Sequence, residues 1–95
     1  MPAYVIVEIE IEDHASYEEY KKLTPPSIAE YGGKFIVRGA QTEILEGDWN
    51  PGRIVVLEFP SAAHIKEWWS SPAYTEAKKI RHRSAKTRML LVEGI

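Results

Sequence analysis

Four short stretches rich in β-branched and aromatic residues, separated by two helical patterns, constrain this 95-residue chain more than any other feature. Such residues favour β-strands, whereas apolar residues at helical spacing favour amphipathic helices. The expected strands cover residues 4–11, 34–40, 53–59 and 87–93. One helical region lies between the first two strands and another between the last two, so the predicted order is β-α-β-β-α-β.

The first helical region carries signals for both its beginning and its end. Asp13 or Ser16 can cap the helix, because short polar side chains accept hydrogen bonds from the free N–H groups of a first turn. We expect Pro25-Pro26 to stop or kink this helix, since proline lacks the N–H that an internal turn needs. A short second piece is then predicted over residues 27–31.

The remaining boundaries follow from serine, proline and glycine positions. Ser61 is expected to cap the second helical region, and Ser71-Pro72 to restart a helix, because proline suits the first helical position. The second strand is expected to continue past Gly39 toward Glu46, with a bulge at the glycine. Strands two and three then form a hairpin with a long tip.

This order predicts an α+β fold in one domain covering residues 1–95. Right-handed crossovers and short connections fold it into a ferredoxin-like sandwich, a four-stranded antiparallel sheet with helices on one face. Strands one and three are then central, with strand four beside strand one and strand two beside strand three.

The strands are apolar on both faces, which predicts self-association. The odd positions expected to face the helices are Val5, Val7, Ile9, Phe35, Val37, Val55, Leu57 and Phe59. Apolar residues at even positions are Tyr4, Ile6, Ile36, Ile54 and Val56. A monomer would expose this second set, which exceeds what soluble monomers normally expose, so we expect a homodimer through the open face. The alternative is a half-polar face in contact with solvent.

Composition excludes several classes of function. The net charge of −2 gives no overall attraction to nucleic acid or to acidic membranes, and no apolar run is long enough for a membrane span. No cysteine and no signal-peptide pattern is present, so we expect a cytoplasmic protein without disulfides. Acidic residues gather before residue 20 and basic residues between 78 and 88. The basic cluster either binds an anionic partner or is neutralised by the adjacent acidic segment.

Three charged residues share the even-numbered face of the predicted sheet. Glu8, Arg38 and Glu58 lie on strands one, two and three, so Arg38 can reach Glu58 with Glu8 nearby. They form either an ion-pair network of the dimer interface or a polar catalytic site in an apolar chamber. In the second case the carboxylates would move a proton and the arginine would hold an anion.

The sequence also resembles a known family. The stretches VRGAQTEILEGDWNPGRIVVLEFPS and WWSSPAYTEAKKIRHRSA, with a closing LLVEG, resemble the domain of unknown function family 1330 of the dimeric α+β barrel superfamily. The resemblance covers nearly the whole chain. Ala40 stands where the family often has a second glycine, and Trp69 where tyrosine or phenylalanine is usual.

The resemblance implies a homodimer whose two sheets face each other and close a barrel. It implies no biochemical activity, because the family has none assigned. Superfamily relatives include cofactor-free monooxygenases, muconolactone isomerase and haem-handling proteins, and their chemistry reaches this chain only by analogy of fold.

Ligand pockets of such relatives lie between the sheet and the helices or at the barrel mouth. Residues of this chain that could line such a pocket are Tyr20, Arg38, Trp68, Tyr74 and Arg81. Arg81 follows Tyr74 by about two helical turns, and an arginine beside aromatic walls suits a carboxylate or enolate of a small aromatic molecule. The alternative is a structural Arg81 tied to carboxylates, with the aromatic residues as ordinary core.

Metal and cofactor chemistry is not expected. His14, His64 and His82 lie on different elements and form no ligand pair at helical spacing. No phosphate-binding glycine loop or nucleophile motif is present.

Three hypotheses of function therefore remain open. The first is a metal-free enzyme acting on a small organic acid or aromatic compound, the second a non-catalytic dimer that binds a small anionic or aromatic ligand, and the third a structural dimer. An empty pocket beside Arg81 favours the first two, and a filled interior favours the third.

Overall fold

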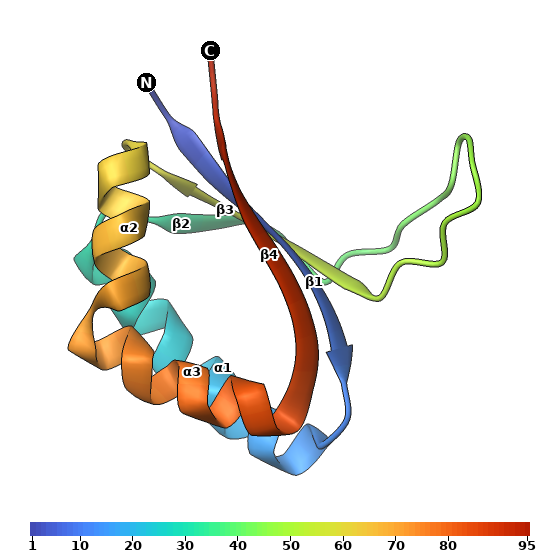
Figure 1. The fold of residues 1–95 in the computed structure, drawn as a ribbon, viewed down its shortest axis with the longest axis horizontal. Helices are drawn as coiled ribbons and strands as arrows, with labels where there is room; N and C mark the ends of the chain where they lie inside the picture. The colour runs from blue at the N-terminus through green and yellow to red at the C-terminus, as the bar shows by residue number, and fades with distance from the viewer.

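The computed structural model describes residues 1–95 and contains one sheet and three helices (Figure 1). In chain order the elements are β1 (Ala3–Ile11), α1 (His14–Glu30), β2 (Lys34–Arg38), β3 (Arg53–Phe59), α2 (Ala62–Ser70), α3 (Pro72–Ser84) and β4 (Ala85–Glu93). The predicted β-α-β-β-α-β order is confirmed, with the second helical region divided in two.

The sheet has the strand order β2-β3-β1-β4, and all neighbouring strands are antiparallel. This is the predicted order, with β1 and β3 in the centre. In the β1–β3 ladder Val5 is opposite Leu57 and Val7 is opposite Val55, and all four side chains are buried. The alternating pattern of β1 therefore does place its odd-numbered residues in the core.

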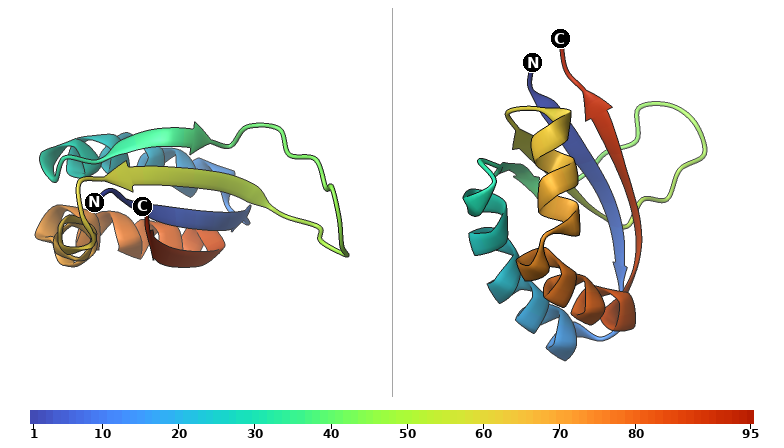
Figure 2. Two further views of the ribbon diagram at one scale, coloured as in Figure 1. Left: turned by 90° about the horizontal axis from the view of Figure 1, so that it is seen from above. Right: turned by 60° about the vertical axis from the view of Figure 1, so that its left-hand side comes forward.

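All three helices lie on one face of the sheet, and the long β2–β3 connection projects from the other side (Figures 1 and 2). The core between sheet and helices contains large buried aromatic side chains, with Trp68 and Phe59 each 1% exposed and Tyr74 fully buried. None of the helices is both long enough and apolar enough to span a membrane.

Helix α1 continues through Pro25 and Pro26, so the predicted break is wrong. The prolines deprive the carbonyls of Lys21 and Lys22 of their usual N–H donors. Residues on both sides of the prolines are packed into the core, with Tyr20 before them and Ile28 after them. Tertiary packing of this face therefore stabilises a helix that local propensity disfavours.

Strand β2 ends at Arg38, and its irregularity lies earlier than predicted. The register shifts between Phe35 and Val37, so Val37 is opposite Val56 and Arg38 is opposite Val55. Directly opposite residues point to the same face of a sheet. Val37 therefore points to the open face and Arg38 to the helix-covered face, the reverse of the prediction, because a bulge inverts the alternation beyond it.

Ser71 joins helices α2 and α3. Its hydroxyl donates to the carbonyl oxygen of Trp68 at 2.7 Å and accepts the Tyr74 N–H at 3.2 Å. With Pro72 in the first turn, this confirms the predicted restart of the helix. The turn fixes Trp68 and Tyr74 relative to each other, and their ring centroids are 4.0 Å apart.

The acidic and basic ends of the chain lie side by side, as the neutralisation hypothesis requires. Glu8 pairs with Arg88 at 3.1 Å across β1 and β4. Glu12 with Lys86 and Glu19 with Arg83 are 3.8 and 3.9 Å apart. Each pair has at least one largely exposed partner, so each contributes at most about 1 kcal/mol.

Candidate functional site

A small cavity lies between α1 and the strands β1, β2 and β3. Its volume is about 30 Å³, enough for roughly one or two water molecules. Apolar side chains form most of its wall, and Phe35, Trp68 and Met89 are among them. Its polar lining consists of Tyr17, Tyr20, Lys21, Thr24, Arg38 and Arg53. Three cations and no carboxylate therefore line this cavity.

Two arginines on neighbouring strands give the cavity its charge. Neither Arg38 nor Arg53 belongs to any of the six ion pairs of the protein. The Arg53 Nε is buried and has no hydrogen-bond partner. The Arg38 guanidinium lies 4.3 Å from the centre of the Phe35 ring, a cation–π contact. Two unpaired guanidinium groups at an apolar cavity attract an anion.

Gly39 makes room for the Arg53 guanidinium. Its φ of +67° is the left-handed conformation that glycine adopts without strain. A Cβ atom at this position would collide with the Arg53 side chain. The backbone N–H of Gly39 also donates to the Ile54 carbonyl oxygen at 2.8 Å. The turn after β2 thereby positions Arg53 as well as Arg38.

Tyrosine hydroxyl groups extend from the cavity into the core. The Tyr20 and Tyr74 hydroxyls are 2.6 Å apart in a buried hydrogen bond. Burial raises the pKa of Tyr17, an effect that the nearby Arg53 charge opposes. Burial also raises the pKa of Tyr20 well above its ordinary value, and the pKa of Tyr74 is raised by burial too. All three phenols therefore stay protonated near neutral pH.

The predicted ligand residues separate into three environments. Tyr20, Arg38 and Trp68 line the cavity, whereas Tyr74 lies behind it, against Trp68 and Tyr20. Arg81 lies outside the cavity, in the wall of a separate groove. Arg81 forms no ion pair, so it is not tied to carboxylates as the alternative expected, but Tyr20, Trp68 and Tyr74 do belong to the hydrophobic core as that alternative had them.

The predicted grouping of Glu8, Arg38 and Glu58 is wrong. The bulge in β2 turns Arg38 toward the helices, away from the two glutamates on the open face. Glu8 accepts a hydrogen bond from Trp49 Nε1 at 3.3 Å and pairs with Arg88 instead. Glu58 pairs with Lys34 at 3.1 Å. Each glutamate thus has a different, partly exposed partner.

Metal ligands do not gather anywhere in the chain. No three histidine, aspartate or glutamate side chains lie close enough together to hold a metal ion. His64 is bound locally, with Nδ1 2.7 Å from the Ser61 hydroxyl at the start of α2.

Sequence reasoning missed Arg53 and Tyr17 as site residues. Arg53 was not among the candidate site residues, although its odd number places it on the same face as Val55. Strand parity was therefore a signal that could have identified Arg53. Tyr17 precedes Tyr20 by one helical turn, and their ring centroids are 5.3 Å apart.

Several solved structures share this fold. A protein of unknown function from Rhodopseudomonas palustris, RPA0582, has a TM-score of 0.79 at 22% identity, over 99% of this chain and 82% of that one. A dimeric ferredoxin-like protein of unknown function from Jannaschia sp. CCS1 has a TM-score of 0.72 at 13% identity, over 99% and 100% of the two chains. SnoaB, a cofactor-independent oxygenase from Streptomyces nogalater, has a TM-score of 0.68 at 10% identity, over 99% and 93%.

At these identities the structural similarities show the fold alone. The sequence matches no curated protein. The model of one family, the domain of unknown function DUF1330, matches residues 2–95. Because the match spans nearly the whole chain, as the Arg38-Gly39 and Ser71-Pro72 motifs suggested, the chain belongs to the DUF1330 family.

Proposed function

We propose that this protein binds a small organic carboxylate at the cavity beneath α1. The observation that carries the proposal is the buried, unpartnered Nε of Arg53 in a wall without carboxylates. Arg53 is half-buried, and a buried nitrogen of a cation that has no carboxylate partner is unfavourable, a cost that a bound carboxylate relieves. Arg38 supplies a second guanidinium on the adjacent strand.

The size of the cavity restricts the ligand. A volume of about 30 Å³ accommodates one or two carbon atoms of an aliphatic tail rather than an aromatic ring. Arg38 is exposed at the cavity mouth, whereas Val7 and Leu57 belong to the buried core behind it. A short aliphatic acid with its carboxylate at the arginines and its tail inward fits this arrangement.

The lining favours binding over acid–base catalysis. Proton abstraction needs a general base that accepts a proton near neutral pH, usually a histidine or a carboxylate. The cavity is lined by neither, and its tyrosines have raised pKa values. Their hydroxyls are suited to donate hydrogen bonds to a bound carboxylate.

Calorimetry with propionate tests this proposal, with propionamide as the uncharged comparison. We expect propionate to bind at least tenfold more tightly than propionamide, because a charge-assisted hydrogen bond contributes about 1.5–3 kcal/mol. Arg38→Gln and Arg53→Met should each weaken propionate binding by a similar factor. Arg88→Gln is the matched control, an exposed arginine of the same sheet, and should bind as the wild type does. Equal binding of acid and amide would refute the proposal.

We further propose that the protein is a homodimer through its open sheet face. Apolar side chains on this face remain exposed, and Ile36, Leu90 and Val92 are 48%, 55% and 41% exposed. The β2–β3 connection on the same side adds Leu45 and Trp49, which are 94% and 62% exposed. The Jannaschia sp. protein of similar fold is dimeric, which supports self-association by analogy of fold.

Sedimentation at micromolar concentration tests the dimer. We expect twice the chain mass for the wild type and a shift to monomer in Leu90→Asp, because a charge would be buried between two apolar faces. Lys79→Asp, on the exposed surface of α3, is the control and should leave the dimer intact. A wild-type monomer would contradict this assembly.

A further inference from the structure

A groove separate from the cavity lies between α2, α3 and β4. Its volume is about 440 Å³, within the range of ~300–1,000 Å³ that is usual for small-molecule sites. Ile65 and Trp69 of α2 line one side, and Met89 and Leu91 of β4 the other. No carboxylate lines the groove.

Two buried polar atoms without partners belong to residues that line this groove. Arg81 is only 4% exposed, and its Nε makes no hydrogen bond. The Thr87 hydroxyl is likewise buried and unpartnered. The Arg81 guanidinium makes a long contact of 3.4 Å to His82 Nε2, and it also lies close enough to the Tyr74 hydroxyl to oppose the rise in the pKa of that phenol. Buried polar groups are normally satisfied, so two unpartnered groups on facing elements of one groove, Arg81 on α3 and Thr87 on β4, indicate a missing partner.

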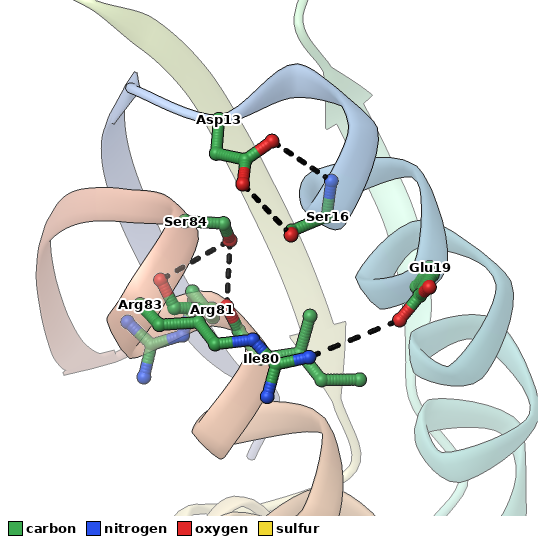
Figure 3. Close-up of polar contacts among 7 residues, drawn as sticks. All are labelled: Asp13, Ser16, Glu19, Ile80, Arg81, Arg83 and Ser84. Carbon is green, nitrogen blue, oxygen red and sulfur yellow. Dashed lines mark hydrogen bonds and ion pairs between the residues drawn. The ribbon is translucent and has the colours of Figure 1, made fainter.

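The backbone around Arg81 is held firmly. Figure 3 shows Ser84 at the end of α3, where its hydroxyl donates to the carbonyl oxygens of Ile80 and Arg81. The carbonyl oxygen of Ser84 accepts the N–H groups of Glu12 and Asp13 at 2.8 and 2.9 Å. Arg81 is therefore presented from a fixed turn, which reduces the entropy lost when it binds a ligand.

Positive charge around the groove is not compensated. The Lys78 ammonium lies 3.4 Å from the centre of the Trp69 ring, which holds this lysine near the groove. Burial and then the Arg81 charge lower the pKa of Lys78, and burial, Arg81 and Lys78 lower the pKa of His82. An anion in the groove would oppose this repulsion. Trp69, 46% exposed, offers an aromatic surface beside the same charges.

We propose that this groove is a second binding site, which takes an aromatic carboxylate with its acid group on Arg81 and its ring beside Trp69. Thr87 supplies a hydroxyl donor from the facing strand. The site is independent of the one proposed beneath α1, although Trp68 and Met89 line both hollows. Test variants must therefore avoid that shared wall.

NMR titration with 2-naphthoate tests the second site, with the Trp69 indole N–H as the reporter. We expect a saturable shift of this resonance and at least tenfold weaker binding of 2-naphthylmethanol, which has the same rings without the charge. Arg81→Met should weaken naphthoate binding tenfold or more, and Thr87→Val by a few-fold. Arg83→Gln is the control on the same helix, since Arg83 is exposed, and should change nothing.

Two outcomes would overturn the second site. One is an unshifted Trp69 resonance, or equal binding of the acid and the alcohol. The other is weakening by Arg53→Met as large as that by Arg81→Met, which would assign naphthoate to the cavity beneath α1. Should Arg81→Met fail to fold, the comparison of 2-naphthoate with 2-naphthylmethanol and the Thr87→Val variant still test whether the acid binds in the groove.

Discussion

Charged side chains on the two sides of the sheet differ in whether they have partners of opposite charge. On the open face Glu8 and Glu58 each have a cationic partner, at 3.1 Å in both cases. On the helix-covered side Arg53 and Arg81 have buried nitrogens and no carboxylate partner. The face that is more exposed to water is thus electrostatically satisfied, and the buried side is not.

This difference separates structural charges from candidate ligand-binding charges. Paired surface charges contribute little and need no ligand to explain them. An unpaired buried cation lowers stability unless something outside the chain neutralises it. Arg53 and Arg81, rather than the paired glutamates, are therefore the candidate ligand-binding charges, and Arg38 is an exposed neighbour of Arg53.

The largest expected difference is between truncating a core residue and truncating an open-face residue, measured as the loss in free energy of unfolding. Trp68→Ala should lower the free energy of unfolding by about 3–5 kcal/mol, because it empties a large core position and removes the indole N–H donor to Ser27. Leu90→Ala, 55% exposed in the single chain, should cost less than about 0.5 kcal/mol at protein concentrations low enough for the dimer to dissociate. Urea unfolding at two protein concentrations measures both. A larger, concentration-dependent loss for Leu90→Ala would show the face to be covered by a second copy.

Two glycine substitutions should differ in their effect on propionate binding. Gly39→Ala should cost about 1–2 kcal/mol from the left-handed backbone and should also weaken propionate binding, because the new Cβ displaces Arg53. Gly47→Ala is the matched control, since its φ is +88° with nothing within 4 Å of an added Cβ. Calorimetry should find unchanged propionate binding in Gly47→Ala. Unchanged binding in Gly39→Ala would mean that Arg53 need not be held in place.

Removal of an unpaired arginine should not destabilise the protein. Arg53→Met should leave the free energy of unfolding unchanged or raise it by about 1 kcal/mol, because a half-buried charge without a carboxylate partner is replaced by an apolar chain. Arg88→Met should lower it by up to about 1 kcal/mol through loss of the pair with Glu8. Thermal unfolding in ligand-free buffer distinguishes the two. Marked destabilisation by Arg53→Met would instead make Arg53 a structural residue.

The smallest effect concerns acid stability at the start of α1. Figure 3 shows Asp13 accepting hydrogen bonds from the N–H and hydroxyl of Ser16, which lower its pKa below the ordinary 3.8. This contribution to stability is present above pH 3.8 and is lost as the pH falls through the lowered pKa. Asp13→Asn keeps a capping side chain but no titrating group, so the stability difference from wild type should shrink between pH 5 and 2. A difference that stays constant over this range would contradict the assignment.

Local sequence signals predicted most of the fold. Alternation in residues 4–11 identified β1 and its buried side, and Ser61 and Ser71-Pro72 marked the starts of α2 and α3. These signals succeed because capping and strand parity depend on residues close in the chain. The Pro25-Pro26 break failed because packing of Ile28 and its neighbours outweighs the loss of two backbone hydrogen bonds.

The candidate sites were predicted only in part. The sequence predicted Tyr20, Arg38, Trp68, Tyr74 and Arg81 as ligand residues of one pocket, whereas the structure places them in a cavity, in the core behind it and in a separate groove. It also placed Arg38 beside Glu58, because a one-residue bulge leaves no clear mark in the pattern of KFIVRG. A single inserted residue reverses the face to which the following side chains point, so a missed bulge places a site residue on the wrong face of the sheet.

The β-α-β-β-α-β order, the helix starts and the apolar character of both sheet faces follow from the amino-acid sequence. Which arginines lie in apolar surroundings without a partner depends on the packed three-dimensional structure. That outcome depends on the bulge in β2, on the backbone at Gly39 and on the closeness of α3 to β4. Periodicity is a property of neighbours in the chain, whereas the environment of a charge is set by residues distant in the sequence.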